Sequence, residues 1–99
     1  MPIDERRRDA IAAAIAAHND TYPEAPLPPA TARLLLAMFP RGDVCQRSLD
    51  DLARVGFDRR GVVRLLHALI EAGLLSKQHG PAPRAPNLYR LHLPPRRRR

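Results

Sequence analysis

Proline restricts the secondary structure of this chain more than any other residue type. It has no backbone N–H to donate, and it disfavours the helical conformation in the residue before it. The sequence has 11 prolines, and most of them occur in clusters. Tyr22–Pro29 contains four, so an extended linker is expected over residues 21–29, and Gly80–Pro86 contains three, so a loop is expected there. Helices and strands are therefore confined to the segments between these clusters, within the single domain that 99 residues predict.

The segment before the first cluster has the spacing of an amphipathic helix. Apolar residues recur at helical intervals over Asp4–His18, and Ile11 and Ile15 are the large residues of this stripe. Such a thin stripe does not stabilise an isolated helix, so the N-terminal segment, residues 1–20, is expected either to pack on the domain body or to form a dimer contact. A second helix is expected over residues 28–39, because prolines suit a helix start and prevent its continuation.

Two short elements are expected next along the chain. Val44–Arg47 has the composition of a short strand. Ser48 stands three residues before Asp51, a spacing in which the serine hydroxyl accepts a hydrogen bond from the backbone N–H of the later residue and starts a helix. Gly56 is expected to end this short helix.

The strongest helical pattern covers Arg59–Ala72. Asp58 is expected to cap its first turn, and Gly73 to end it in the left-handed conformation that glycine tolerates best. Large apolar residues at helical spacing define one face, which consists of Val62, Leu65, Leu66, Leu69 and Ile70. The opposite face carries Arg59, Arg60, Val63, Arg64 and His67.

Two strands are expected after this helix, over Leu74–His79 and Asn87–Leu93. In the second strand, Tyr89, Leu91 and Leu93 share one face, as the apolar residues of a half-buried strand do. The proline-rich loop connects the two strands. We therefore expect a β-hairpin at the end of the domain.

The net charge of +7 lies in the C-terminal part of the chain. Residues 1–58 contain seven Arg and nine acidic residues and sum to −2, whereas residues 59–93 sum to +5 and residues 96–99 add +4. The use of Arg in place of Lys is typical of GC-rich coding, but coding bias alone would spread arginine along the whole chain. The localised excess therefore predicts an acidic partner, most often nucleic acid.

Several other classes of protein lack support in the sequence. No apolar stretch is long enough for a membrane span, and the single cysteine, Cys45, permits no internal disulfide. The four histidines do not have zinc-binding spacing, and no catalytic Ser, His and acid grouping, paired carboxylates or phosphate-binding loop stands out. We therefore expect neither an enzyme nor a metal or cofactor site. We do expect Cys45 to be buried and the protein to be located in the reducing cytoplasm.

The order of helix, short strand, helix, turn, helix and hairpin resembles the winged helix-turn-helix DNA-binding domain family, which includes small prokaryotic transcriptional regulators. The resemblance is most specific over Val62–Lys77, VVRLLHALIEAGLLSK, where a helix ends in an acid and a glycine before two apolar residues start a strand. NLYRLHL, residues 87–93, is similar to the returning strand of the wing. The resemblance implies a mainly α fold with a small β-hairpin wing over residues 28–93, preceded by an extra N-terminal helix and followed by a basic tail at residues 94–99.

The resemblance also makes Arg59–Ala72 the recognition helix, which enters the major groove of DNA. Gly61 and Val63 stand where these helices often carry Ser or Thr, which leaves fewer polar groups for reading bases. Arginine reads guanine through two hydrogen bonds, and the arginine at the helix start is closer to phosphate. The residues of this helix expected at the DNA are Arg59, Arg60, Val63, Arg64 and His67.

The wing and the tail are expected to add contacts with the DNA backbone. In the wing these residues are Lys77, Arg84 and Arg90, and Arg84 at the tip is suited to a minor groove. The tail residues Arg96, Arg97, Arg98 and Arg99 would supply attraction that is independent of base sequence and weakened by salt.

The function expected from these features is binding of double-stranded DNA by a small transcriptional regulator. A homodimer is expected, because two-fold symmetry pairs two recognition helices with two half-sites, and the protein would then be associated with the nucleoid. Two alternatives stay open: a winged-helix module that binds another protein through its N-terminal helix and apolar patches, and binding of structured RNA or the ribosome. Single-stranded targets are disfavoured, because the chain has only two Tyr and two Phe to stack on bases.

Overall fold

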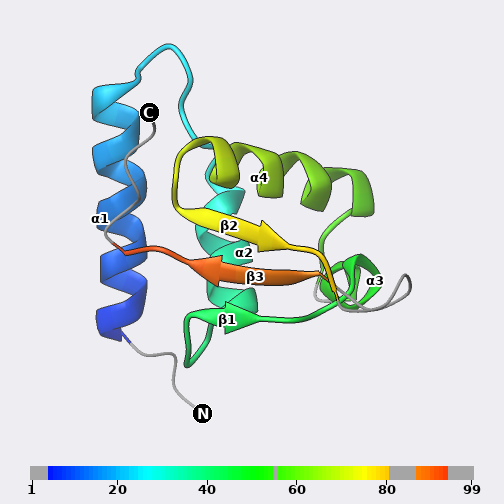
Figure 1. Ribbon diagram of the computed structural model, residues 1–99. Helices are drawn as coiled ribbons and strands as arrows, with labels where there is room; N and C mark the ends of the chain where they lie inside the picture. Colours follow the sequence, from blue (N-terminus) through cyan, green and yellow to red (C-terminus); the bar gives the residue numbers. More distant parts are fainter. Residues whose placement is uncertain (1–4, 55, 81–86, 94–99) are drawn as a thin grey trace.

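The computed structural model of the protein describes residues 5–54, 56–80 and 87–93. These residues form a mainly helical domain with a small antiparallel sheet, so the expected class of fold is confirmed at this level (Figure 1). In chain order the elements are α1 (Glu5–Thr21), α2 (Ala30–Met38), β1 (Val44–Cys45), α3 (Leu49–Ala53), α4 (Arg59–Glu71), β2 (Leu75–Gln78) and β3 (Leu88–Leu91).

The three strands are arranged in the order β1-β3-β2, and both pairings are antiparallel. The hairpin of β2 and β3 was expected, whereas the position of β3 between the other two strands had no signal in the sequence. β1 is shorter than the expected Val44–Arg47, because it pairs with β3 at two positions only before the chain turns into α3. The backbone N–H of Leu91 extends this pairing by donating to the carbonyl of Asp43 at 2.8 Å.

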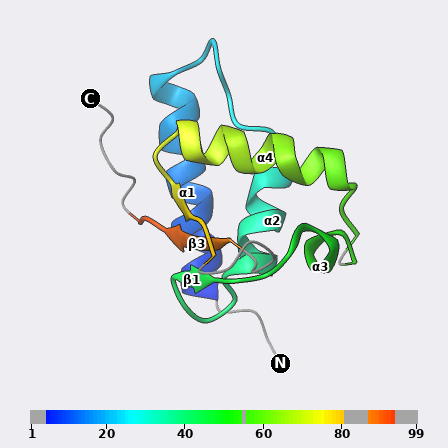
Figure 2. The same cartoon turned by 45° about the vertical axis from the view of Figure 1, so that its right-hand side comes forward.

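The apolar core is built around α2, which is the central helix. α2 packs against α1 on one side and α4 on another, and α4 also packs against β2 (Figure 2). The largest fully buried side chains come from all four helices and from the residues that follow α2 and α4, and they are Phe39, Ile11, Leu34, Leu35, Leu52, Leu69, Leu74 and Val62. A continuous apolar interior therefore joins the N-terminal helix to the rest of the domain.

α1 packs on the domain body of its own chain. Ile11 is 1% exposed, and Ile15 is partly buried against the core. The helix is longer than the expected Asp4–His18, and the N–H of Tyr22 still donates to the carbonyl of His18. The apolar stripe of α1 was expected either to pack on the domain body or to form a dimer contact. In the structure it packs on the domain body.

The linker expected over residues 21–29 is shorter than predicted, because Thr21 still belongs to α1, and it is held to the domain at more than one point. His18 Nε2 lies 3.2 Å from the carbonyl oxygen of Ala25. Leu27 is buried in the core, and its N–H donates to the Asn19 side-chain oxygen at 2.7 Å. The segment thus returns the chain from the end of α1 to the start of α2 as part of the packed domain.

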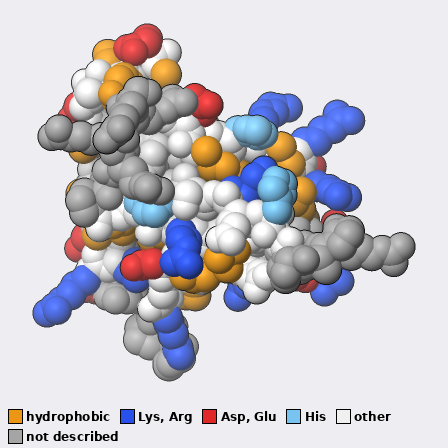
Figure 3. Space-filling view, viewed as in Figure 1, with side chains coloured by type: hydrophobic (Ala, Val, Ile, Leu, Met, Phe, Trp, Pro, Cys, Tyr) orange, Lys and Arg blue, Asp and Glu red, His pale blue; other side chains and the backbone are white. Residues whose placement is uncertain are grey.

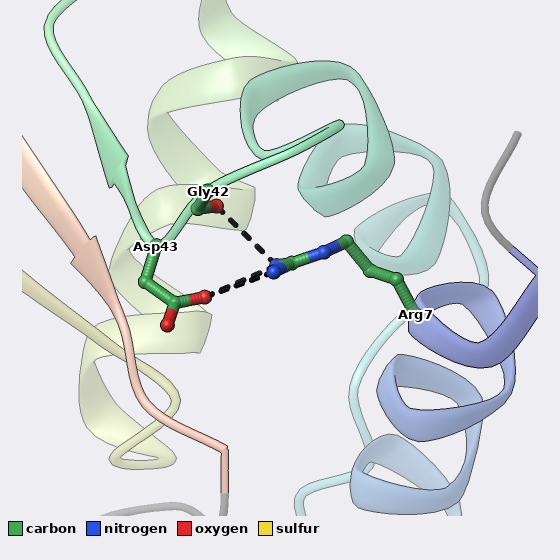
Figure 4. A network of polar contacts seen from close by, with 3 residues as sticks. All are labelled: Arg7, Gly42 and Asp43. Carbon is green, nitrogen blue, oxygen red and sulfur yellow. Dashed lines mark hydrogen bonds and ion pairs between the residues drawn. The ribbon is translucent and has the colours of Figure 1, made fainter.

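A polar contact ties the first turn of α1 to the turn before β1. The Arg7 guanidinium donates to the carboxylate of Asp43 and to the carbonyl of Gly42 (Figure 4). The residues it joins are far apart in the sequence, so no local pattern indicates it.

The expected helix signals around α3 and α4 are confirmed. Ser48 Oγ accepts from the N–H of Asp51 at 3.1 Å, and Asp58 Oδ2 accepts from the N–H of Gly61 at 3.3 Å. Gly73 has φ +79°, and the N–H of Leu74, the next residue, donates to the carbonyl of Leu69. This reversal at Gly73 places β2 directly beside α4.

Candidate nucleic-acid interface

The outward face of α4 is cationic, with three exposed arginines. On the opposite, inward face of α4, Val62, Leu65, Leu66 and Leu69 are buried and Ile70 is partly buried, as the spacing predicts, whereas the residues of α4 expected at the DNA are all exposed. Lys and Arg side chains gather around the end of α4 that lies near α3, at the right of Figure 3. The exposed residues are Arg59, Arg60, Val63, Arg64 and His67.

Arg60 and Arg64 are one helical turn apart and therefore point in nearly the same direction. Within residues 5–54, 56–80 and 87–93, no ion pair or side-chain hydrogen bond involves either of them. Their guanidinium groups are thus exposed charges with no acid to neutralise them in the described part of the chain. Each presents donors in a planar fork that matches guanine or phosphate.

Arg59 differs from these two arginines. Its Nη1 lies 3.6 Å from Asp50 Oδ1 of α3, and both side chains are largely exposed. An exposed pair of this kind contributes little to stability, because water competes for both charges. Arg59 therefore lies toward α3, at the edge of the cationic face, where a phosphate would compete with Asp50 for it.

The turn that leads into α4 is held by a residue that sequence reasoning missed. The guanidinium carbon of Arg33, on α2, lies 5.1 Å from the centre of the Phe57 ring, a distance typical of a cation–π contact. Phe57 immediately precedes Asp58, which caps α4. Arg33 is thus suited to fix the start of α4 relative to α2.

The two described cations of the hairpin point to opposite faces of the sheet. Lys77 is paired with Tyr89, whereas Arg90 is paired with Ser76. Residues paired directly across strands share a face, and neighbours along a strand do not. Lys77 and Tyr89 line one depression together with residues of α4, so their face is turned toward α4. Arg90 lies on the other face, so the contacts expected of both do not belong to one surface.

A shallow depression lies between α4 and the hairpin, with a volume of about 150 Å³. Its lining is mainly apolar, and its polar residues include Lys77 from the hairpin and His67 from α4. Asn87 also lies here and was not among the expected site residues. The full lining is Leu49, Val63, Leu66, His67, Ile70, Lys77, Asn87 and Tyr89.

Other expected cations of the interface, Arg84 and Arg96–Arg99, lie outside the described residues. The described residues also contain no group of three or more His, Cys, Asp or Glu side chains placed to hold a metal ion. Cys45 is 5% exposed, and burial raises the pKa of its thiol although a backbone hydrogen bond and the charge of Arg47 act in the opposite direction.

None of the helices in the described part of the chain has the length and apolar character needed to cross a membrane. Comparison of the sequence with protein-family models and with curated proteins found no match. The geometry and charge of the α4 face are therefore the features of this protein that bear on its function.

Proposed function

We propose that this protein binds double-stranded DNA by inserting α4 into the major groove, as a winged helix-turn-helix domain whose wing is the hairpin of β2 and β3. The observation that carries the proposal is the pair Arg60 and Arg64, exposed one turn apart on a helix whose other face is buried. The order of the elements and the strand order β1-β3-β2 support this fold. The major groove of B-DNA is wide enough for one α-helix.

The proposal gives the residues of the α4 face different tasks. Arg60 and Arg64 read guanine or hold phosphate, and His67 contacts a base or phosphate beside them. Lys77, which lines the depression beside α4, contacts the phosphate backbone that borders the groove. Arg90 lies on the other face of the sheet, so it takes little part in this surface.

A transcriptional regulator of this kind would act as a homodimer, which presents two α4 helices to two half-sites about one helical turn apart. The dimer contact must use residues other than Ile11, because that side chain is 1% exposed in the single chain. Light scattering on the free protein and on its DNA complex measures the stoichiometry.

The alternative of a protein-binding module has less support on α1. That module would use the apolar stripe of the helix, but Ile11 and Ile15 pack against the chain's own core. Binding of structured RNA stays a competing proposal, since the same cations attract any polyphosphate.

The test is fluorescence anisotropy with labelled random-sequence duplexes over a salt series, followed by in-vitro selection of duplex ligands. We expect binding at about 50 mM salt that weakens steeply as salt increases, because phosphate contacts release counterions. We also expect selection to yield a defined sequence. No duplex binding at low salt, or preferential competition by structured RNA of equal length, contradicts the proposal.

A further inference from the structure

One apolar side chain is exposed in the middle of the cationic face of α4. Val63 is 37% exposed, and it is one of three large hydrophobic residues exposed in the part of the chain that the structure describes. The other two, Tyr22 and Val44, do not belong to α4. The remaining apolar residues of α4 are buried or partly buried, so this exposure is specific to one position of the helix.

The neighbours of Val63 place it among the groups proposed to read bases. Arg60 and His67 lie one turn before and one turn after it, so they share its side of the helix, and Arg64 follows it directly. Its isopropyl group is thus flanked by donors without itself offering any.

Val63 also forms part of the apolar lining of the depression beside α4. Leu66 and Ile70 of the same helix continue this lining toward the hairpin. The exposed side chain of Val63 is therefore continuous with an apolar lining to which other residues of α4 contribute.

We propose that Val63 recognises the 5-methyl group of a pyrimidine in the major groove, beside bases that Arg60 and Arg64 read. This inference rests on the proposed binding of DNA by α4. Among the standard bases only thymine presents a methyl group in the major groove, and apolar side chains contact it. 5-Methylcytosine carries the same group at the same ring position, so the two sources share one chemistry and are separated by experiment.

The experiment uses the full chain and the duplex obtained by in-vitro selection. Each thymine is replaced in turn by deoxyuridine, which lacks only the methyl group, and each cytosine by 5-methylcytosine. Dissociation constants are measured for the natural protein, for Val63→Ala and for Val44→Ala. Val44 is the matched control, since it is 50% exposed and lies on β1.

We expect one thymine at which loss of the methyl group weakens binding about fourfold, the value that transfer of one buried methylene from water implies. Alternatively, one added cytosine methyl group strengthens binding by a similar factor, which identifies 5-methylcytosine as the source. Either effect should vanish in Val63→Ala and persist in Val44→Ala, because only Val63 is proposed to contact the methyl group. Comparing the two duplexes with each variant is a double-mutant cycle, which isolates the contact between the side chain and the methyl group.

Two results overturn the inference while leaving the proposed function in place. One is duplex binding that responds to no methyl group at any position. The other is a methyl effect that is the same in Val63→Ala as in the natural protein. If the protein binds no duplex at all, the proposed function fails and this inference fails with it. Circular dichroism of both variants establishes that they are folded.

Discussion

The Nη1 atom of Arg7 lies 3.1 Å from Oδ1 of Asp43, which joins the N-terminal helix to the turn that starts the sheet. The guanidinium also donates to the carbonyl of Gly42 at 3.3 Å. Asp43 in turn accepts the N–H of Leu91 through its own backbone carbonyl. One side chain of α1 thus supports the turn on which the pairing of β1 with β3 depends.

Loss of this contact is expected to destabilise the protein modestly. Arg7 is 18% exposed but Asp43 is 68% exposed, so solvent screens the pair, and we expect Arg7→Ala to lower the free energy of unfolding by about 1 kcal/mol. Urea denaturation measures the change. Arg8→Ala is the control, since Arg8 is an exposed residue of the same helix. Equal stability of the two variants would show that the contact contributes nothing.

The backbone conformation of Gly73 gives a second prediction. Its φ of +79° is strained for any residue with a Cβ, so we expect Gly73→Ala to destabilise the protein by about 1–2 kcal/mol. Gly42→Ala is a suitable control, because a Cβ at Gly42 meets nothing within 4 Å and the φ of this residue is not positive. Thermal unfolding of both variants tests the difference, and a Gly73→Ala protein as stable as Gly42→Ala would be inconsistent with the reversal described after α4.

The buried thiol of Cys45 gives a prediction about pH. Burial raises its pKa, so the folded protein keeps the neutral thiol at a pH where an unfolded thiol has begun to ionise. We expect slow alkylation of the native protein and fast alkylation in denaturant at the same pH. The contribution of this thiol to the free energy of unfolding is fully present below the ordinary thiol pKa, and it decreases as the pH rises above that value. Alkylation of the native protein at the denatured rate would show that the thiol is accessible.

Local signals in the sequence predicted most of the helices, and long-range contacts account for what they missed. The caps at Ser48 and Asp58 and the reversal at Gly73 depend on residues within one turn, so their spacing is visible in the sequence. The pairing of β1 with β3 and the contact of Arg7 with Asp43 join distant segments, and no local pattern specifies them.

The candidate site was also predictable only where local patterns specify it. The period of α4 indicated which of its residues are exposed. The alternation in β3 placed Tyr89 and Arg90 on opposite faces, but only the register with β2 shows that Lys77 shares the face of Tyr89. The sequence therefore grouped Lys77 with Arg90, whereas the structure separates them. Arg33 was missed because its partner, Phe57, is distant in the sequence, in the turn before α4.

That separation yields a direct test of which surface meets DNA. Arg64→Ala and Arg90→Ala remove the same charge from exposed positions, so they change long-range attraction alike and stability little. We expect Arg64→Ala to weaken binding of the selected duplex by about 1–3 kcal/mol and to relax its base preference at one position, because a base contact is lost. Arg90→Ala should weaken specific and random duplexes equally and slightly. Anisotropy titrations with both duplexes distinguish the cases, and similar losses in the two variants would mean that α4 attracts DNA by charge without reading it.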